Sequence, residues 1–116
     1  MRKYKNDKQL HIIKITADGI ASAIDIPNTL QAMQEIVGGY IEAVYIGKGV
    51  NVICNEEGTL LRLPYNEKAV NVCSGFSDFH TRLFGTIFFV GAASDRFRSL
   101  DDMQIKELLK YAEVGR

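Results

Sequence analysis

The fold of this chain is decided by residues 37–66, VGGYIEAVYIGKGVNVICNEEGTLLRLPYN. Two runs within it, residues 40–46 and 50–55, alternate as extended strands do. Between them, residues 47–49 read Gly-Lys-Gly and supply the positive φ that a short hairpin turn needs. Because neither face of the first run is polar throughout, we expect it to be a central strand covered on both sides.

An acidic turn follows this hairpin. Glu56 and Glu57 precede Gly58, which we expect in the left-handed conformation. The two carboxylates could serve acid–base chemistry or a metal, but adjacent turn residues point apart into solvent, which favours a charged turn. Leu60, Leu61 and Leu63 then predict renewed strand pairing, which Pro64 ends because it lacks an N–H.

The segment before the hairpin predicts a second hairpin and a helix. Residues 10–16 and 20–26 alternate about Asp18-Gly19, a strong two-residue turn signal. Residues 30–37 carry an apolar helical stripe that Asn28 caps and Gly38-Gly39 ends.

The segment after the hairpin predicts one further strand and a closing helix. Residues 67–84 are compatible with two structures. One is a helix whose apolar stripe is Phe76, Phe79, Leu83 and Phe84, and the other is a loop that places its aromatic residues under the sheet. Residues 85–92 form a buried strand, and Phe97 is a brief strand end. We expect Ser99 to cap a C-terminal helix. Its stripe is Ile105, Leu108, Leu109 and Ala112.

These elements predict a single α+β domain over residues 1–116, with residues 1–9 frayed. A β-hairpin, a helix, a β-hairpin, a strand and a C-terminal helix form a largely antiparallel sheet of about five strands, with the helices on one face. Exposed edge strands favour a homo-oligomer.

The sequence also resembles a family of small uncharacterised proteins carried by phages, plasmids and other mobile elements of bacteria. The pattern is VGGYIE, then CNEEG followed by Leu-Leu, Leu-Pro and Asn, then GTIFFVG, and it spans residues 28–110. The resemblance implies a fold and a genomic setting but no established activity. Its motif positions here are Cys54, Asn55, Glu57, Gly58, Leu63, Pro64 and Asn66.

Composition limits the classes of function. Fourteen basic and fourteen acidic residues cancel, which argues against general nucleic-acid binding. Two cysteines without CxxC spacing indicate reduced thiols in the cytoplasm. No apolar run approaches the roughly 20 residues of a membrane span. We therefore expect a cytoplasmic protein with no membrane attachment and no cofactor.

Catalytic and metal motifs are weak. Cys54 or Cys73 could pair with His11 or His80 as an activated nucleophile, but no spacing supports this, and free cysteines are common in cores. The His and Cys residues stand singly, without metal-ligand spacing. We predict no catalytic residue and no metal site.

One mixed cluster suggests a ligand. Arginines, an amide and an aromatic ring can hold an anionic, nucleotide-like molecule, although a solvated rim of the protein explains the same residues. The candidate ligand-binding residues are Tyr65, Asn66, His80, Arg82, Arg96 and Arg98.

Two classes of function follow. The first is a non-enzymatic mobile-element accessory protein that sequesters a small anionic ligand in counter-defence. The second is a protein-interaction module that inhibits or modulates a host or phage protein through an exposed sheet edge or face. An enzyme ranks third, because the motifs for one are missing from the sequence.

Overall fold

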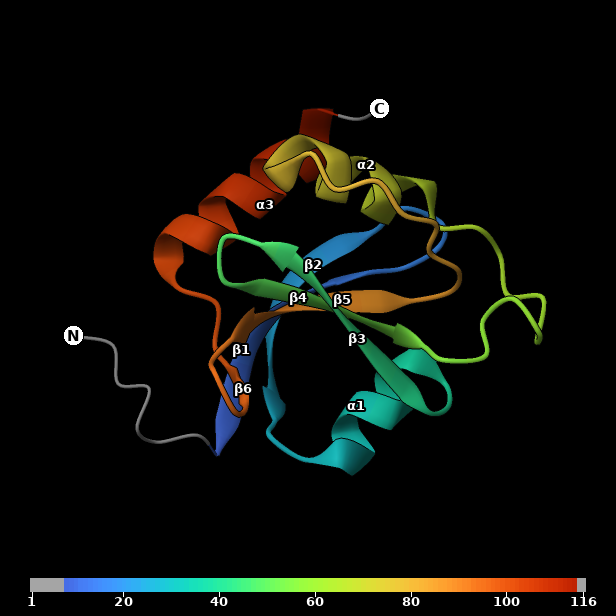
Figure 1. Cartoon of the computed structure of the whole chain (residues 1–116), viewed down its shortest axis with the longest axis horizontal. Helices are drawn as coiled ribbons and strands as arrows, with labels where there is room; N and C mark the ends of the chain where they lie inside the picture. The colour runs from blue at the N-terminus through green and yellow to red at the C-terminus, as the bar shows by residue number, and fades with distance from the viewer. Residues whose placement is uncertain (1–7, 115–116) are drawn as a thin grey trace.

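The computed structural model describes residues 8–114 and shows one sheet between two helical layers (Figure 1). The strands are β1 (Gln9–Ile15), β2 (Ala21–Pro27), β3 (Ile41–Gly47), β4 (Val50–Asn55), β5 (Ile87–Ala92) and β6 (Phe97–Arg98). The helices are α1 (Leu30–Val37), α2 (Glu67–Ser77) and α3 (Asp102–Val114). Residues 1–7 of the predicted frayed segment lie outside the described residues, and Gln9 already belongs to β1.

The sheet confirms the predicted α+β class. Its six strands run β2-β1-β5-β4-β3, with β6 on β5, and every pairing is antiparallel. The expectation that residues 40–46 form a central strand is wrong, because β3 lies at the edge. The centre belongs to β5, whose residues from Ile87 to Gly91 are all buried.

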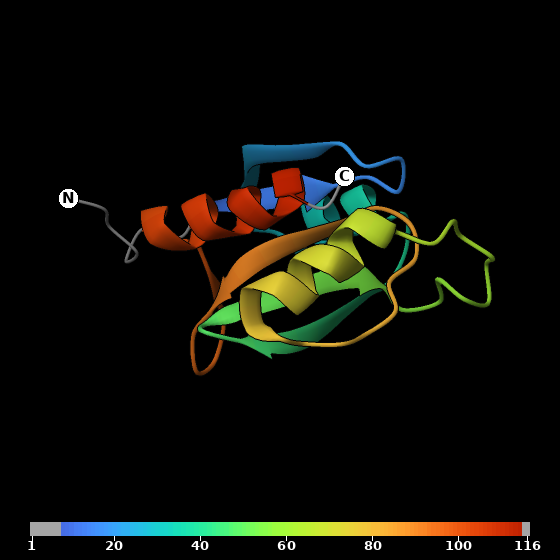
Figure 2. The same ribbon diagram turned by 90° about the horizontal axis from the view of Figure 1, so that it is seen from above.

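Helices cover both faces of the sheet, whereas the sequence predicted one. Figure 2 shows α2 and α3 side by side on one face, and α1 lies across the other. The alternation of β5 explains this arrangement: Phe89 packs beneath α2 and α3, while Phe88 and Val90 pack toward α1. The predicted C-terminal stripe is confirmed, since Leu108 is buried against the sheet.

The helix ends differ from the expected caps. Thr29, not Asn28, caps α1, because its Oγ1 accepts a hydrogen bond from the Ala32 N–H at 3.0 Å. Gly38 ends that helix in the left-handed conformation, as predicted. At α3 the expected cap Ser99 is replaced two residues later by Asp101, whose carboxylate accepts from the Gln104 N–H at 2.7 Å.

The middle segment resolves into helix and then loop. Residues 67–77 form α2, whose buried stripe is Ala69, Val72, Cys73 and Phe76. Of the four stripe residues expected from the aromatic spacing, only Phe76 lies in the helix. Among the described residues, no helix is both long and apolar enough to cross a membrane.

Candidate functional site

The connection between β4 and α2, residues 56–65, projects from one end of the sheet (Figures 1 and 2). We call it the β4–α2 loop. A buried asparagine holds each of its ends. Asn55 donates from Nδ2 to the Val37 carbonyl oxygen at 3.1 Å, and its Oδ1 accepts from the Glu57 N–H at 2.7 Å. The first end of the loop is therefore tied to the C-terminus of α1.

Asn66 fixes the other end. Its side chain is fully buried, and Nδ2 donates to the carbonyl oxygens of Ile15 at 3.0 Å and Gly85 at 2.8 Å. Its Oδ1 accepts from the Ala69 N–H at 3.0 Å and so caps α2. One side-chain amide thus joins β1, α2 and the residue pair that precedes the central strand β5. Its hydrogen-bonding groups are used inside the fold.

The loop has its own backbone structure. Residues 60–63 do not form the strand predicted for them; a hydrogen-bonded turn takes its place, in which the Leu61 N–H donates to the Glu57 carbonyl oxygen at 2.8 Å. Leu63 donates to the Gly58 carbonyl oxygen and Arg62 donates to that of Thr59, each at 3.0 Å, with Arg62 at φ 57°. This pair of bonds with a left-handed residue is the Schellman arrangement that ends helices. The loop is therefore held by its own hydrogen bonds as well as at both ends.

Gly58 has a different role from the one predicted. Its φ lies outside the positive range. A Cβ at this position would lie 3.3 Å from the Phe84 Cβ and 3.4 Å from the Asn55 carbonyl oxygen. Close packing between the loop and the segment before β5, not backbone handedness, explains the glycine.

The outer surface of the loop is apolar. Leu60 is 77% exposed and Leu61 is 50% exposed, and Tyr65 is also exposed. Two adjacent leucines on a hydrogen-bonded loop differ from isolated surface leucines, which are common and need no explanation.

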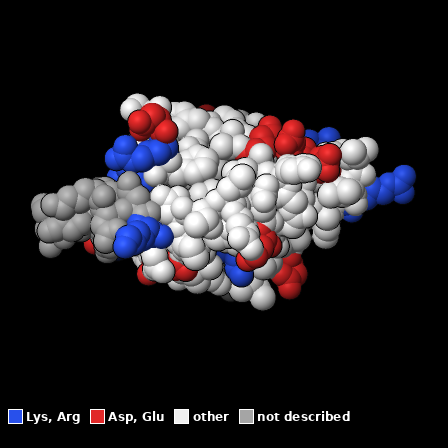
Figure 3. Space-filling model, turned by 90° about the horizontal axis from the view of Figure 1, so that it is seen from below, with Lys and Arg blue, Asp and Glu red and all other residues white. Residues whose placement is uncertain are grey.

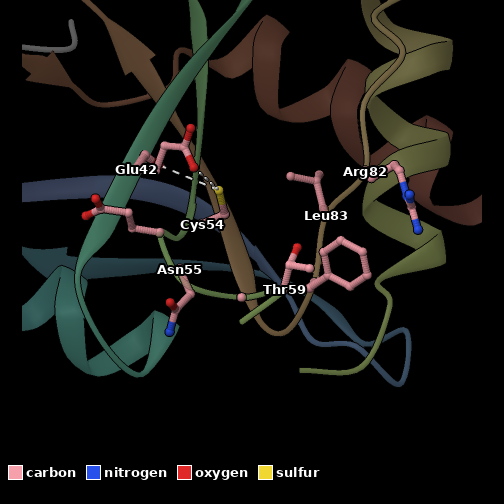
Figure 4. Close-up of a pocket in the computed structure, with 9 residues that line it drawn as sticks. Glu42, Cys54, Asn55, Thr59, Arg82 and Leu83 are labelled. Atoms are coloured by element: carbon pink, nitrogen blue, oxygen red, sulfur yellow. Dashed lines mark hydrogen bonds between the residues drawn. The ribbon is translucent and has the colours of Figure 1, made fainter. Parts of the chain in front are cut away.

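A pocket of about 230 Å³ lies beside the loop. Its lining includes Glu42 from β3, Cys54 and Glu56, and, from the segment before β5, Arg82 and Phe84. In Figure 4 the Glu42 carboxylate points toward the Cys54 sulfur, whereas the Arg82 guanidinium points away from both. Two carboxylates and one outward arginine make this pocket a poor match for an anion.

Both thiols are held in the neutral form. Burial, assisted by the neighbouring Glu42, raises the pKa of Cys54 to about 11. Burial raises the pKa of Cys73 to about 12. Because the thiolate is the nucleophile, these environments favour core packing over the alternative of a Cys–His pair.

Of the six predicted ligand-binding residues, the structure brings Tyr65 and Arg82 together on the Phe84 ring and places the others elsewhere. Tyr65 meets Phe84 edge-on, with ring centroids 5.6 Å apart, and Arg82 lies 5.5 Å above the same Phe84 ring. His80 contacts Asp78 at 2.9 Å on the exposed turn after α2. Asn66 is buried among backbone groups, as described above.

Arg96 and Arg98 lie at the other end of β5 from Arg82. Arg96 contacts Asp95 at 3.3 Å, and Arg98 is in β6, paired with Gly91. A six-residue strand spans about 20 Å at roughly 3.3 Å per residue, so one chain does not bring the three arginines around one small ligand.

A model of the family described as a domain of unknown function (DUF3846) matches residues 10–113. The chain belongs to this family. Searches of the curated proteins and of the solved structures find no match to this chain.

In this DUF3846 chain, most of the predicted motif positions build the β4–α2 loop. Asn55 and Asn66 anchor its ends, and Gly58 packs against Phe84. Leu63 covers Gly85, and the Pro64 carbonyl oxygen accepts from the Gly85 N–H at 2.7 Å. The role of these residues is therefore to shape and fix the loop.

Leu60 and Leu61 were missed as candidate site residues. Their apolar character was interpreted as strand pairing, although Gly58-Thr59 before them and Pro64 after them leave room only for a short turn. Within the described residues, no group of His, Cys, Asp and Glu side chains is arranged to hold a metal ion.

Proposed function

We propose that this protein is a non-enzymatic interaction module whose β4–α2 loop docks into an apolar groove of another protein. One observation supports this above the others. Leu60 and Leu61 are presented to solvent by a loop that Asn55 and Asn66 fix at both ends.

The energetics favour exposure of the two leucines for binding a partner over exposure without a role. An ordered loop loses backbone entropy, about 1–2 kcal/mol per residue, and Leu60 and Leu61 bury little apolar surface in return. Burying each leucine in a groove would contribute about 1.5–3 kcal/mol. Because the loop is already ordered, its binding would cost less entropy than that of a flexible segment.

The charge distribution agrees with an apolar contact. Figure 3 shows acidic and basic side chains interspersed on the face that carries α1, with uncharged surface between them. This face therefore has no concentration of like charges that would attract a partner of opposite charge. The loop offers Leu60 and Leu61 with Arg62 beside them, a leucine pair with one flanking cation.

The resemblance to mobile-element proteins extends the proposal. It would make the partner a host or phage protein, which the loop inhibits or modulates in the cytoplasm. Inhibition by docking needs no catalytic group on this chain.

The test compares loop variants with a matched control. Leu60→Ser with Leu61→Ser removes the apolar tip, and Met103→Ser changes a residue on α3 that is 80% exposed. Affinity capture from the producing cells should retain one protein with the wild type and with Met103→Ser, and lose it with the loop variant. A partner retained equally by all three, or by none, contradicts the proposal.

Sequestration of a small anionic ligand is the second candidate. Its support is the stack of Arg82 on Phe84, with Tyr65 at the ring edge, beside the pocket. Glu42 and Glu56 in the same lining oppose an anion, so docking ranks first. Calorimetric titration with mono-, di- and cyclic nucleotides tests this candidate. Affinities all weaker than about 100 μM, near −5.5 kcal/mol, would exclude it.

A further inference from the structure

The outer edge of β3 has unpaired backbone groups at alternate residues. The Tyr40 carbonyl oxygen accepts from the Glu56 N–H at 2.8 Å, in register with the β3–β4 ladder. Hydrogen-bonded and non-bonded pairs alternate in an antiparallel ladder, so Glu42 and Val44 bond to β4. The N–H and C=O groups of the residues between them therefore point away from the sheet. These residues are Ile41, Ala43 and Tyr45.

This edge is open in the part of the chain that the structure describes. β4 is the one strand there that pairs with β3, and Figure 2 shows β3 along one side of the molecule. Ala43 and Tyr45 are exposed. Sheet edges are usually protected by lysine, proline or inward-pointing charge. Between Ile41 and Ile46 the sequence has none of these apart from Glu42.

The opposite edge, β2, is protected. The Asn28 N–H donates to the Lys8 carbonyl oxygen, so by the same alternation the outward residues of β2 include Ala23, Asp25 and Pro27. Pro27 has no N–H to offer, and Asp25 places a carboxylate at this edge. One edge of the sheet thus resists pairing and the other allows it.

We propose that β3 pairs antiparallel with β3 of a second copy of this chain, about a two-fold axis at Ala43. In this register Ala43 lies opposite Ala43 of the partner subunit, and Ile41 lies opposite Tyr45 of the partner subunit. All three outward residues then form hydrogen-bonded pairs, each exchanging two bonds. The two sheets become continuous.

Side chains select this register. Glu42 faces Val44 of the partner subunit rather than another glutamate, and the small Ala43 leaves the axis free of clashes. A shift by two residues in one direction puts Glu42 opposite Glu42 of the partner subunit, which like-charge repulsion disfavours. A shift in the other direction pairs Ile41 with Gly47, where the β3–β4 register is irregular.

The pairing would also reach the pocket. Glu42 lines the pocket from β3, and the proposed register places Val44 of the partner subunit opposite Glu42. The β4–α2 loops, which begin beside Tyr40, lie at opposite ends of the paired strands. The dimer would thus present two docking loops, an arrangement that the proposed function of one subunit does not require.

The interface is small. An edge of seven residues buries less than the 1,200–2,000 Å² of a typical stable interface, so we expect a dissociation constant on the order of micromolar. Sedimentation velocity of the full chain, from about 1 to 500 μM, should show the mass rise from one chain to two.

Proline substitution at matched positions tests the edge. Ala43→Pro removes an outward N–H without removing a bond to β4, and Ala23→Pro does the same at the outer edge of β2. We expect Ala43→Pro to remain monomeric at every concentration and Ala23→Pro to dimerise like the wild type. Ala43→Lys and Ala23→Lys give the same comparison without changing the backbone.

Cysteine cross-linking tests the register. Cα atoms in a hydrogen-bonded pair are about 5.5 Å apart, within disulfide range. Ala43→Cys should therefore oxidise to a covalent dimer. Tyr45→Cys should not, because the two cysteines would be four residues apart along the strand. A wild type that stays monomeric at 500 μM, or Ala43 variants that dimerise as well as the Ala23 variants, would overturn the proposal.

Discussion

Replacing Asn66 with alanine tests how the loop and the core are joined. The side chain makes three buried hydrogen bonds, to Ile15, Gly85 and Ala69. At about 1 kcal/mol of net stabilisation for each bond, Asn66→Ala should lower the free energy of unfolding by about 3 kcal/mol. The backbone groups left unpaired in the interior would add to this loss. Urea denaturation followed by circular dichroism measures the change.

Two further variants distinguish the tie, meaning the hydrogen bonds from Asn66 to Ile15 and Gly85, from the cap that Asn66 provides for α2. Asn66→Asp keeps an acceptor for the Ala69 N–H but places an oxygen, instead of a donor, against the carbonyl oxygens of Ile15 and Gly85. We expect it to be destabilised as well. Asn71→Ala, at an exposed position of α2, should change stability by less than about 0.5 kcal/mol. An Asn66→Asp variant as stable as the wild type would show that capping alone explains Asn66 and would refute the tie.

The remaining predictions concern the core, the thiols and the loop turn. Leu108→Ala should cost about 2–5 kcal/mol by denaturant titration, and a loss under about 0.5 kcal/mol would contradict its core position. Cys54 should react with a thiol reagent far more slowly in the native than in the unfolded protein; fast native labelling would restore the nucleophile interpretation. The folded chain holds the Cys73 proton up to a pKa of about 12, against 9.0 ordinarily, while the unfolded chain releases it earlier. Stability should therefore fall as pH rises above about 9, and less steeply in Cys73→Ala across a pH series of urea titrations. Arg62→Gly should raise stability by up to about 1 kcal/mol in thermal melts, because glycine adopts the left-handed conformation at lower cost; a clear loss would contradict the turn geometry.

The sequence predicted those elements whose signals are local. The Gly-Lys-Gly hairpin is confirmed, with positive φ at Gly47, Lys48 and Gly49, and so is the stripe of α3. Each of these signals lies within a few consecutive residues or helical turns, so tertiary contacts need not be known to interpret it.

Strand order was not predictable in the same way. Neither face of β3 is polar throughout in the sequence, and this pattern does not tell an edge strand from a central one. Its edge position follows from the pairing of β1 with β5, which brings Ile13 opposite Phe89 across 76 residues of sequence. Because β5 pairs with both β1 and β4, it takes the centre.

The candidate residues predicted from the sequence include Tyr65 and Asn66 at the end of the β4–α2 loop, but not Leu60 and Leu61 within it. Tyr65 and Asn66 were predicted to line a ligand site or a solvated rim, yet Asn66 is directed into the core by Ile15 and Gly85, which lie 51 and 19 residues away in the sequence. The exposure of Leu60 and Leu61 depends on the turn that Arg62 closes. No local pattern distinguishes a leucine that packs inside from one that a loop holds in solvent.

Site-specific photo-crosslinking tests the docking proposal most directly. A photoreactive phenylalanine analogue replaces Leu60 at the loop tip or, as the control, the equally exposed Met103 on α3. On irradiation of producing cells, the analogue at position 60 should link the chain to one protein, and the analogue at position 103 should not. Identical cross-links from both positions, or none from position 60, would contradict the assignment of the β4–α2 loop as the interaction surface.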